Sequence, residues 1–276
     1  SDTTPPTVTL TSAQTSPTNA TTINMTATFS EDVTGFDLKD ITVVGGTAGN
    51  FAATSATIYT FDITAPAPAV TVDVAVSTAQ DSAGNQNTAA TQFALTYDAT
   101  GPSVTGVSSP SANTTYPLAS VIPIVVTFDE AVTVTGLPQI TLATGTPAVV
   151  DYTSGSGTTD LTFNYTVSAS HTATDLDYVS TTALALNAGT ITDLAGNTAT
   201  LTLAAPGASG SLGNNKSLGV DSTAPTATTT TGHPTGTSAT TTLSITVSGA
   251  DVTHYKHKVG DSGSITCSVT AGYSAE

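Results

Sequence analysis

The sequence predicts an all-β protein made of two-layer sandwiches that follow one another along the chain. Three observations lead to this prediction: apolar residues alternate with threonine over short segments, turn-forming residues separate those segments, and an Asp-x-Thr-x-Pro motif occurs three times. The motif begins at Asp2, Asp98 and Asp221, so its copies lie 96 and 123 residues apart. Such a period has the length of a domain and is too long for a solenoid repeat.

The motif spacing divides the chain into three parts. We expect one domain over residues 1–98, a second over 99–221 and an incomplete third over 222–276. The second is longer mainly through a Gly/Ser/Asn-rich insertion near 204–215. The 55 residues after Asp221 are too few for a seven-stranded sandwich. We therefore expect the third part to be truncated, disordered or completed by strands from another chain.

Composition narrows the possible partners. The 276-residue chain has a formal net charge of −16 and contains no arginine and no tryptophan. The composition argues against nucleic acid as a partner, because there is no basic stripe to bind phosphate, whereas cations suit this charge. No apolar run is long enough to span a bilayer. A single cysteine, Cys267, provides no disulfide framework.

Alternation with a period of two predicts half-buried strands, and β-branched residues favour them further. No helix of ordinary length is predicted anywhere. The clearest predicted strands are residues 7–11, 22–29, 70–76, 122–128, 160–167, 198–203, 242–247 and 264–269.

Two further motifs recur in the same order in the first two parts. Phe-Ser-Glu-Asp-Val-Thr at 29–34 matches Phe-Asp-Glu-Ala-Val-Thr at 128–133, and Asp-Ser-Ala-Gly-Asn at 81–85 matches Asp-Leu-Ala-Gly-Asn at 193–197. With about seven short strands per hundred residues, these motifs resemble the bacterial immunoglobulin-like repeats of large surface adhesins. The resemblance covers residues 2–221 and extends more weakly over 222–276. It implies immunoglobulin-like sandwiches stacked into an elongated rod, at the bacterial cell surface or secreted, with calcium at the domain junctions.

The order of the strands predicts that acidic residues meet at one end of each sandwich. The linker, the end of the second strand and the turn before the last strand should all lie there, and clustered carboxylates need a cation or a proton. Calcium binds several such oxygens in flexible geometry. The candidate metal ligands are Asp2, Glu31, Asp32 and Asp81 in the first part, Asp98, Asp129, Glu130 and Asp193 in the second, and Asp221. The alternative is that each aspartate only stabilises its own turn, and that Asp-x-Thr-x-Pro is a kinked linker.

Other candidate sites are weaker. Asp175 and Asp177 share one face of an extended segment, but a solvated face beside a buried leucine explains them better. His254 and His257 fall on opposite faces of a predicted strand, and His171 and His233 each stand alone in a polar loop. The sequence shows no nucleophile beside a base, and it has few aromatic residues on which a sugar ring could stack. We therefore assign no catalytic residue and expect no enzyme.

The sequence favours a non-catalytic stalk segment of an extracellular bacterial adhesin or surface fibre, rigidified by calcium at its domain junctions. Its expected partners are neighbouring domains of a longer chain and, in a fibre, identical chains; no receptor is indicated. One alternative is that the domains are accessory or glycan-binding modules of a secreted carbohydrate-active enzyme. Another is a polymerising fibre subunit completed by strand donation.

Overall fold

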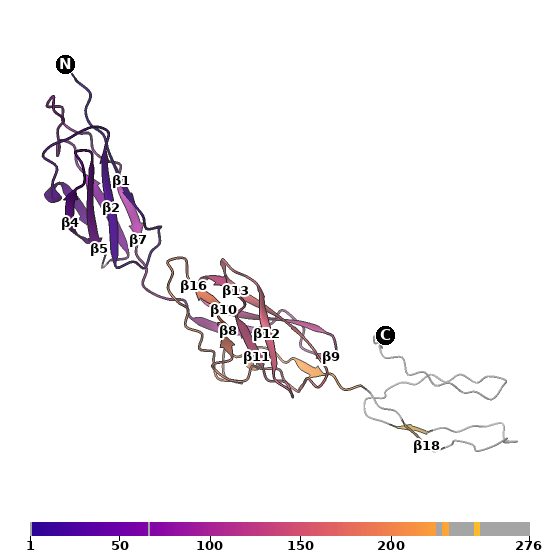
Figure 1. The fold of residues 1–276 in the computed structure, drawn as a ribbon. Helices are drawn as coiled ribbons and strands as arrows, with labels where there is room; N and C mark the ends of the chain where they lie inside the picture. Colours follow the sequence, from indigo (N-terminus) through magenta and orange to yellow (C-terminus); the bar gives the residue numbers. More distant parts are fainter. Residues whose placement is uncertain (1, 66, 225–227, 232–245, 249–276) are drawn as a thin grey trace, which may run out of the picture. The chain divides into compact units, whose positions relative to one another are not determined.

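The protein is described here by a computed structural model covering residues 2–65, 67–224, 228–231 and 246–248 (Figure 1). The chain divides into two compact units, Ser1–Asp221 and Ser222–Glu276. In the second unit, β18 (Thr228–Thr231) pairs antiparallel with β19 (Thr246–Ser248). The predicted strand at 264–269, most of the predicted strand at 242–247, the three histidines of the third part (His233, His254 and His257) and Cys267 lie outside the described residues. The all-β prediction is confirmed.

The first sandwich has two antiparallel sheets. The strands alternate buried with more exposed side chains, as the period-two pattern predicts, except the strand at 47–53, which has no buried residue. One sheet has the order β1 (Val8–Ser12), β2 (Thr22–Phe29), β5 (Ile58–Thr64) and β4 (Thr47–Ala53), and the other has the order β3 (Ile41–Val44), β6 (Ala69–Val74) and β7 (Phe93–Thr96). The buried faces of both sheets form one hydrophobic core.

An aromatic cluster fixes the chain that follows β2. The rings of Phe29, Phe36 and Tyr59 meet edge to face, with centroids 5.1 to 5.7 Å apart. The Tyr59 hydroxyl donates to the Val33 carbonyl at 3.2 Å. Edge-to-face aromatic pairs stabilise a core beyond their buried area. The segment between Phe29 and Phe36 is therefore anchored at both ends, although Glu31 within it is only half-buried.

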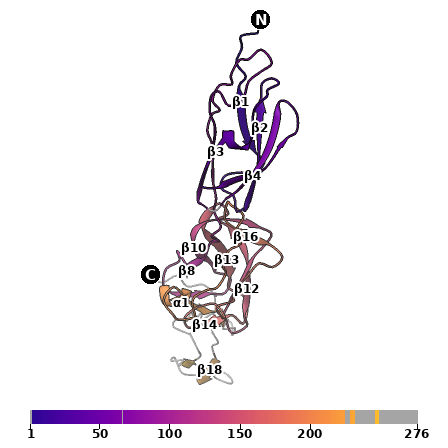
Figure 2. The same ribbon diagram turned by 90° about the vertical axis from the view of Figure 1, so that its left-hand side faces the viewer.

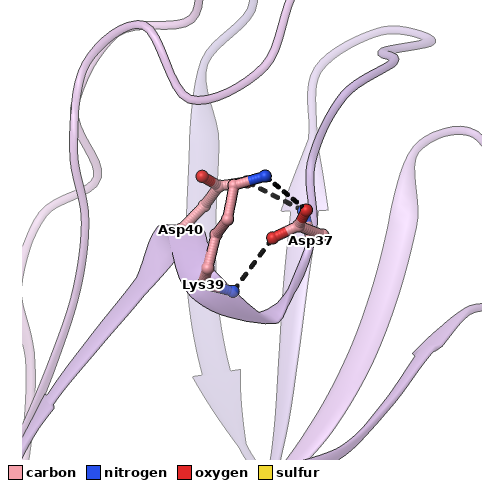
Figure 3. Close-up of polar contacts among 3 residues, drawn as sticks. All are labelled: Asp37, Lys39 and Asp40. Atoms are coloured by element: carbon pink, nitrogen blue, oxygen red, sulfur yellow. Dashed lines mark hydrogen bonds and ion pairs between the residues drawn. The ribbon is translucent and has the colours of Figure 1, made fainter.

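A short 3₁₀ helix, η1 (Leu38–Asp40), precedes β3 (Figure 3). The Asp37 side chain accepts from the Lys39 backbone N–H at 3.0 Å, while Asp40 accepts from the Asp37 N–H at 2.9 Å. The Lys39 ammonium also lies 2.7 Å from the Asp37 carboxylate. Both side chains are well exposed, so this ion pair adds little stability.

The second sandwich has a larger sheet and a smaller one (Figure 2). The larger has the order β15 (Leu184–Ala185), β11 (Gln139–Leu142), β12 (Ala148–Ser154), β13 (Thr158–Thr166), β10 (Val121–Thr135) and β16 (Thr190–Thr192), with β8 (Val104–Ser108) also on β10. The smaller has the order β14 (Thr172–Ala173), β17 (Gly219–Asp221) and β9 (Thr115–Pro117). A core separate from the first fills the space between them.

Two segments of the second sandwich differ from their predicted form. The stretch 198–203 makes only isolated bridges, from Thr198 to Thr192 and from Thr200 to Ser103. Ala199 and Leu203 are buried, as the alternation predicts, but the segment pairs with neighbouring backbone only at single residues. The predicted strand at 198–203 is therefore wrong.

The Gly/Ser/Asn-rich insertion is packed against the sandwich. It contains a one-turn helix, α1 (Leu212–Asn215), whose Leu212 side chain is fully buried. The Asn215 side-chain amide donates to the Val107 carbonyl at 2.9 Å. The Gly207 N–H donates to the Asp177 carboxylate at 2.9 Å. Asp177, predicted to be solvated, is instead half-buried and holds this loop.

The pairing of strand β10 changes where its acidic residues lie. Its first part pairs with β13 and β8, its last part pairs with β16, and the register shifts between Thr127 and Val132. A bulge bends a strand and redirects its side chains. Asp129 and Glu130 lie in this irregular stretch.

The two separate cores make a test of the fold possible. Ile63 and Ile124 are fully buried, one in each core. We expect Ile63→Ala and Ile124→Ala each to lower the free energy of unfolding of its own sandwich by about 2–5 kcal/mol, through lost burial and the cavity left behind. Calorimetry would measure this. Val44→Ala, on an exposed side chain, is the control and should change stability by less than about 0.5 kcal/mol. Losses below about 1 kcal/mol in both core variants would contradict the assignment of the cores.

Candidate functional site

Three carboxylates meet in each sandwich. In the first they belong to Asp2, Glu31 and Asp81, and each offers an oxygen that lies within 4.8 Å of the other two. In the second, Asp98, Glu130 and Asp193 meet within the same limit. We call these groups the first and second acidic clusters. Each contains one residue from the linker, the glutamate of the Phe-x-Glu-x-Val-Thr motif and the aspartate of the Asp-x-Ala-Gly-Asn turn.

Backbone pairing places the glutamate of each cluster beside the turn aspartate. In the first sandwich, Thr34 and Gln80 exchange two backbone hydrogen bonds, of 2.8 and 3.1 Å. In the second, Thr133 and Thr192 lie opposite each other in the ladder of β10 and β16. Gln80 and Thr192 each directly precede the turn aspartate. The register of this pairing therefore brings the two acidic segments together in both repeats.

Further backbone bonds bring the linker aspartate to the same place. The Ser30 N–H donates to the Thr7 carbonyl and the Thr88 N–H donates to the Pro6 carbonyl, both at 2.9 Å. The linker thus runs between the end of β2 and the turn before β7. The corresponding bonds of the second sandwich run from the Asp129 N–H to the Ser103 carbonyl (3.0 Å) and from the Thr200 N–H to the Pro102 carbonyl (2.8 Å).

The Asp-x-Ala-Gly-Asn turn holds its aspartate rigidly. Asp81 Oδ1 accepts the backbone N–H groups of Ala83 and Asn85, each at 2.8 Å, and Oδ2 accepts the Asn85 side-chain amide at 2.8 Å. Gly84 has φ +90°, a conformation that favours glycine, which explains the glycine of the motif. The Asp81 side chain is only 4% exposed. These hydrogen bonds, that of the Asn85 side chain first, lower its pKa.

The asparagine of the motif joins the turn to the linker, a role that we did not predict from the sequence. The Asn197 side-chain amide donates to Asp193 Oδ2 at 2.8 Å and to the Asp98 carbonyl at 2.9 Å. The Asn85 amide makes the equivalent bond to the Asp2 carbonyl at 3.2 Å. The occurrence of this asparagine in both copies of the motif is the sequence feature from which its role could have been predicted.

Turn formation accounts for part of the aspartate pattern. Besides the two turn aspartates, the linker residues Asp2 and Asp98 each accept a backbone N–H two residues later, from Thr4 and Thr100, at 2.9 Å. This is the local bonding expected of aspartate in turns. A carboxylate has about four lone-pair sites, so these bonds leave oxygen positions available to a cation.

Turn formation does not account for the two glutamates. Within the described part of the chain, neither the Glu31 nor the Glu130 carboxylate accepts a hydrogen bond or forms an ion pair. Partial burial raises the pKa of Glu31, and the charges of Asp2 and Asp81 raise it further. Burial likewise raises the pKa of Glu130, helped by Asp193, Asp98 and Asp129. Each cluster therefore holds like charges whose repulsion the described residues do not compensate.

Three predicted ligands lie outside the clusters. Asp129 occupies the position of Ser30 in the aligned motifs, and its carboxylate accepts the Ser103 N–H at 2.8 Å and hydroxyl at 2.6 Å. The Ser103 hydroxyl bond is the main cause of its lowered pKa. Asp32 is exposed and aligns with Ala131. Asp221 ends β17, in the ladder between β14 and β9.

The fold of the first sandwich agrees with a comparison against known families. Residues 2–97 match the family described as "Bacterial Ig-like domain". This segment is a bacterial Ig-like domain. Such domains are typically non-catalytic structural modules and are common in surface or extracellular proteins. No curated protein matches the chain. In the described residues, no helix has the length and apolar character needed to cross a membrane.

The match includes all three residues of the first acidic cluster and ends before Asp98. The second cluster therefore lies wholly beyond the matched bacterial Ig-like domain. It repeats the geometry of the first with the same three residue types at the same three places. The shared geometry is the reason that we treat both clusters as one kind of site.

The pKa values of the clusters can be tested without metal. In calcium-free buffer we expect the Glu130 carboxyl to titrate above its ordinary value of 4.5, and Asp129 to titrate below 3.8. Because the folded-state pKa of Glu130 is raised, its ionisation lowers stability as pH rises through that pKa. Asp193→Asn should lower the pKa of Glu130 by removing a negative neighbour. Carboxyl ¹³C NMR would measure both values.

The control for this titration is Asp175→Asn, which alters an exposed aspartate that is not a cause of the Glu130 shift. It should leave the pKa of Glu130 unchanged. An ordinary pKa for Glu130 in the metal-free protein would contradict the description of the second cluster.

Proposed function

We propose that both acidic clusters bind calcium, and that the chain is a non-catalytic stalk segment of an extracellular bacterial adhesin or surface fibre, rigidified at its domain junctions. The observation that supports this most is the recurrence of one three-carboxylate arrangement in two successive sandwiches. In each case one ligand comes from the linker that leads into the sandwich.

The chemistry of the donors fits calcium. Calcium–oxygen distances are 2.3–2.6 Å, so two oxygens bound to one ion lie at most about 5 Å apart. The cluster oxygens meet this limit, since all three lie within 4.8 Å of one another. Calcium accepts six to eight oxygens in flexible geometry, whereas magnesium demands a near-ideal octahedron and retains several waters. A half-exposed site with three carboxylates suits calcium better.

The electrostatics of the clusters support a bound cation. A divalent ion would replace the mutual repulsion of three carboxylates by attraction. It would also offset the repulsion by neighbouring carboxylates, which, after burial, raises the pKa values of Glu31 and Glu130. The net charge of −16 favours the approach of cations to the whole chain.

Asp98 explains how an ion could stiffen the junction. Its backbone N–H donates to the Thr18 carbonyl of the first sandwich at 2.9 Å. Its carboxylate belongs to the second acidic cluster, with Glu130 and Asp193. One residue is thus bonded to one sandwich through its main chain and would be bound to the next through the ion. Calcium would reduce the number of conformations open to the linker.

The expected stabilisation is moderate. Extracellular calcium modules often have Kd values of about 10⁻⁴–10⁻³ M. At ten times Kd, occupancy adds about 1.4 kcal/mol per site, which corresponds to a rise in Tm of roughly 5 °C for a domain of this size. Calcium would then adjust the stiffness of the junction without being the main source of folding stability.

Calorimetry in millimolar calcium and in excess chelator would test the proposal. For the wild type we expect a higher Tm in calcium by roughly 5 °C. Glu130→Gln should abolish the response of the second sandwich, and Glu31→Gln that of the first. In chelator both variants should be at least as stable as the wild type, because each removes a repelling charge.

Asp32→Asn is the matched control, because it removes one negative charge next to Glu31 but outside the cluster. It should keep the full calcium response. If the wild type melts identically in calcium and in chelator, the calcium proposal is wrong and the repeated aspartates only stabilise their turns. Small-angle scattering of the full chain in both buffers would then test stiffening directly, with a narrower distribution of distances expected in calcium.

A further inference from the structure

Two neighbouring strands of the second sandwich separate along part of their length. The ladder between β12 and β13 is confined to Tyr152 opposite Phe163 and Ser154 opposite Thr162. Before Tyr152, β12 pairs with β11 alone, and after Phe163, β13 pairs with β10 alone. A gap therefore opens inside the larger sheet, and two strand edges face it.

The backbone groups of β12 that face this gap follow from its pairing with β11. The Tyr152 N–H donates to the Pro138 carbonyl at 2.8 Å, so Tyr152 directs its backbone groups toward β11. In an antiparallel ladder these directions alternate from one residue to the next. Val150 therefore also faces β11, whereas Val149 and Asp151 direct their N–H and carbonyl groups toward β13.

The facing groups of β13 follow in the same way. The Val167 N–H donates to the Ser120 carbonyl at 2.9 Å, on the β10 side. Thr166 and Asn164 therefore face β12, and the Asn164 N–H does donate to Thr153 Oγ1 at 3.2 Å. Val149 would lie opposite Thr166 if the ladder continued. It does not continue, and in the described part of the chain neither residue has a ladder partner on that side.

The gap is a cavity of about 450 Å³. Its walls include Asp151, an exposed acid, and the Tyr165–His171 pair. The Tyr165 hydroxyl lies 2.9 Å from His171 Nδ1, which also accepts the Ser168 N–H at 3.2 Å. The ring of His171 stacks on Tyr165, so this histidine does not stand alone in its loop as predicted. The pair forms a fixed wall at one end of the gap.

We propose that this gap binds an extended segment of a partner polypeptide, about four residues long, that carries a basic side chain. Val149 and Asp151 on β12 and Thr166 on β13 direct backbone groups into the gap and have no ladder partner across it, whereas the Asn164 N–H is already bonded to Thr153 Oγ1. These groups match the hydrogen bonding of one inserted strand. Because β12 and β13 are antiparallel, the inserted strand runs parallel to one and antiparallel to the other. The Asp151 carboxylate and the negative chain favour lysine or arginine on the segment.

The gap suits a single strand better than a second copy of the chain. Stable dimer interfaces bury on the order of 1,000 Å² or more, with an apolar centre. Here the walls are backbone edges and polar side chains, with Val149 as an exposed apolar residue. The gap therefore provides hydrogen bonds and one charge, which are the features that recognise an extended peptide.

Hydrogen exchange of the full chain would test the proposal with a synthetic eight-residue peptide of alternating threonine and valine around one central lysine. We expect the amides of Val149 and Thr166 to exchange at least tenfold more slowly when the peptide is present. Val149→Pro removes a gap-side N–H and no bond to β11, and it should weaken peptide binding at least tenfold. Val149→Thr, which keeps the N–H, should bind within twofold of the wild type.

Peptide variants keep the test independent of protein folding. The same peptide with N-methyl groups at alternate residues should lose binding, and a glutamate in place of the lysine should weaken it at least fivefold. Glu130→Gln should leave binding unchanged, which separates this proposal from the calcium sites. The proposal is overturned if the peptide fails to bind, if Val149→Pro or N-methylation has no effect, or if sedimentation shows that self-association protects the same amides.

Discussion

The acidic clusters depend on one backbone pairing in each sandwich, between the threonine that ends the Phe-x-Glu-x-Val-Thr motif and the residue before the Asp-x-Ala-Gly-Asn turn. Thr34 with Gln80, and Thr133 with Thr192, fix this register. A slip of one residue would turn the glutamate toward the other face. Core packing supports the register, since Val33 and Val132 are buried at the same point of both repeats. The hydrophobic core thus brings together charges that repel one another.

Much of this arrangement is predictable from the sequence, because it follows from strand order and recurring motifs. Alternation locates β2 to the residue, and the path of the chain predicts that linker, strand end and turn converge. Alternation also makes 198–203 resemble a strand, but it reports burial of Ala199 and Leu203 and carries no information about whether a partner backbone lies alongside. Pairing depends on residues distant in sequence.

Individual side chains are harder to place than segments. Glu130 and Asp129 are adjacent acids, yet one joins the cluster and the other binds Ser103. Alignment of the two repeats could have separated them, since Asp129 replaces Ser30, which bonds the linker in the same manner. The Tyr165–His171 pair has no such internal copy for comparison. Its formation depends on the path of the loop after β13, which no local pattern specifies.

The double attachment that we propose for Asp98 affects how the molecule would respond to force. Tension applied along the chain would pass from β7 through this residue into the second sandwich. The junction and the sandwiches would carry the same force, and the bond of Asp98 to Thr18 and its contacts in the carboxylate cluster would break before either hydrophobic core unfolds. A metal–carboxylate contact can break and form again without unfolding a domain. With calcium bound as proposed, the junction would therefore yield and recover under tension while both sandwiches stay folded.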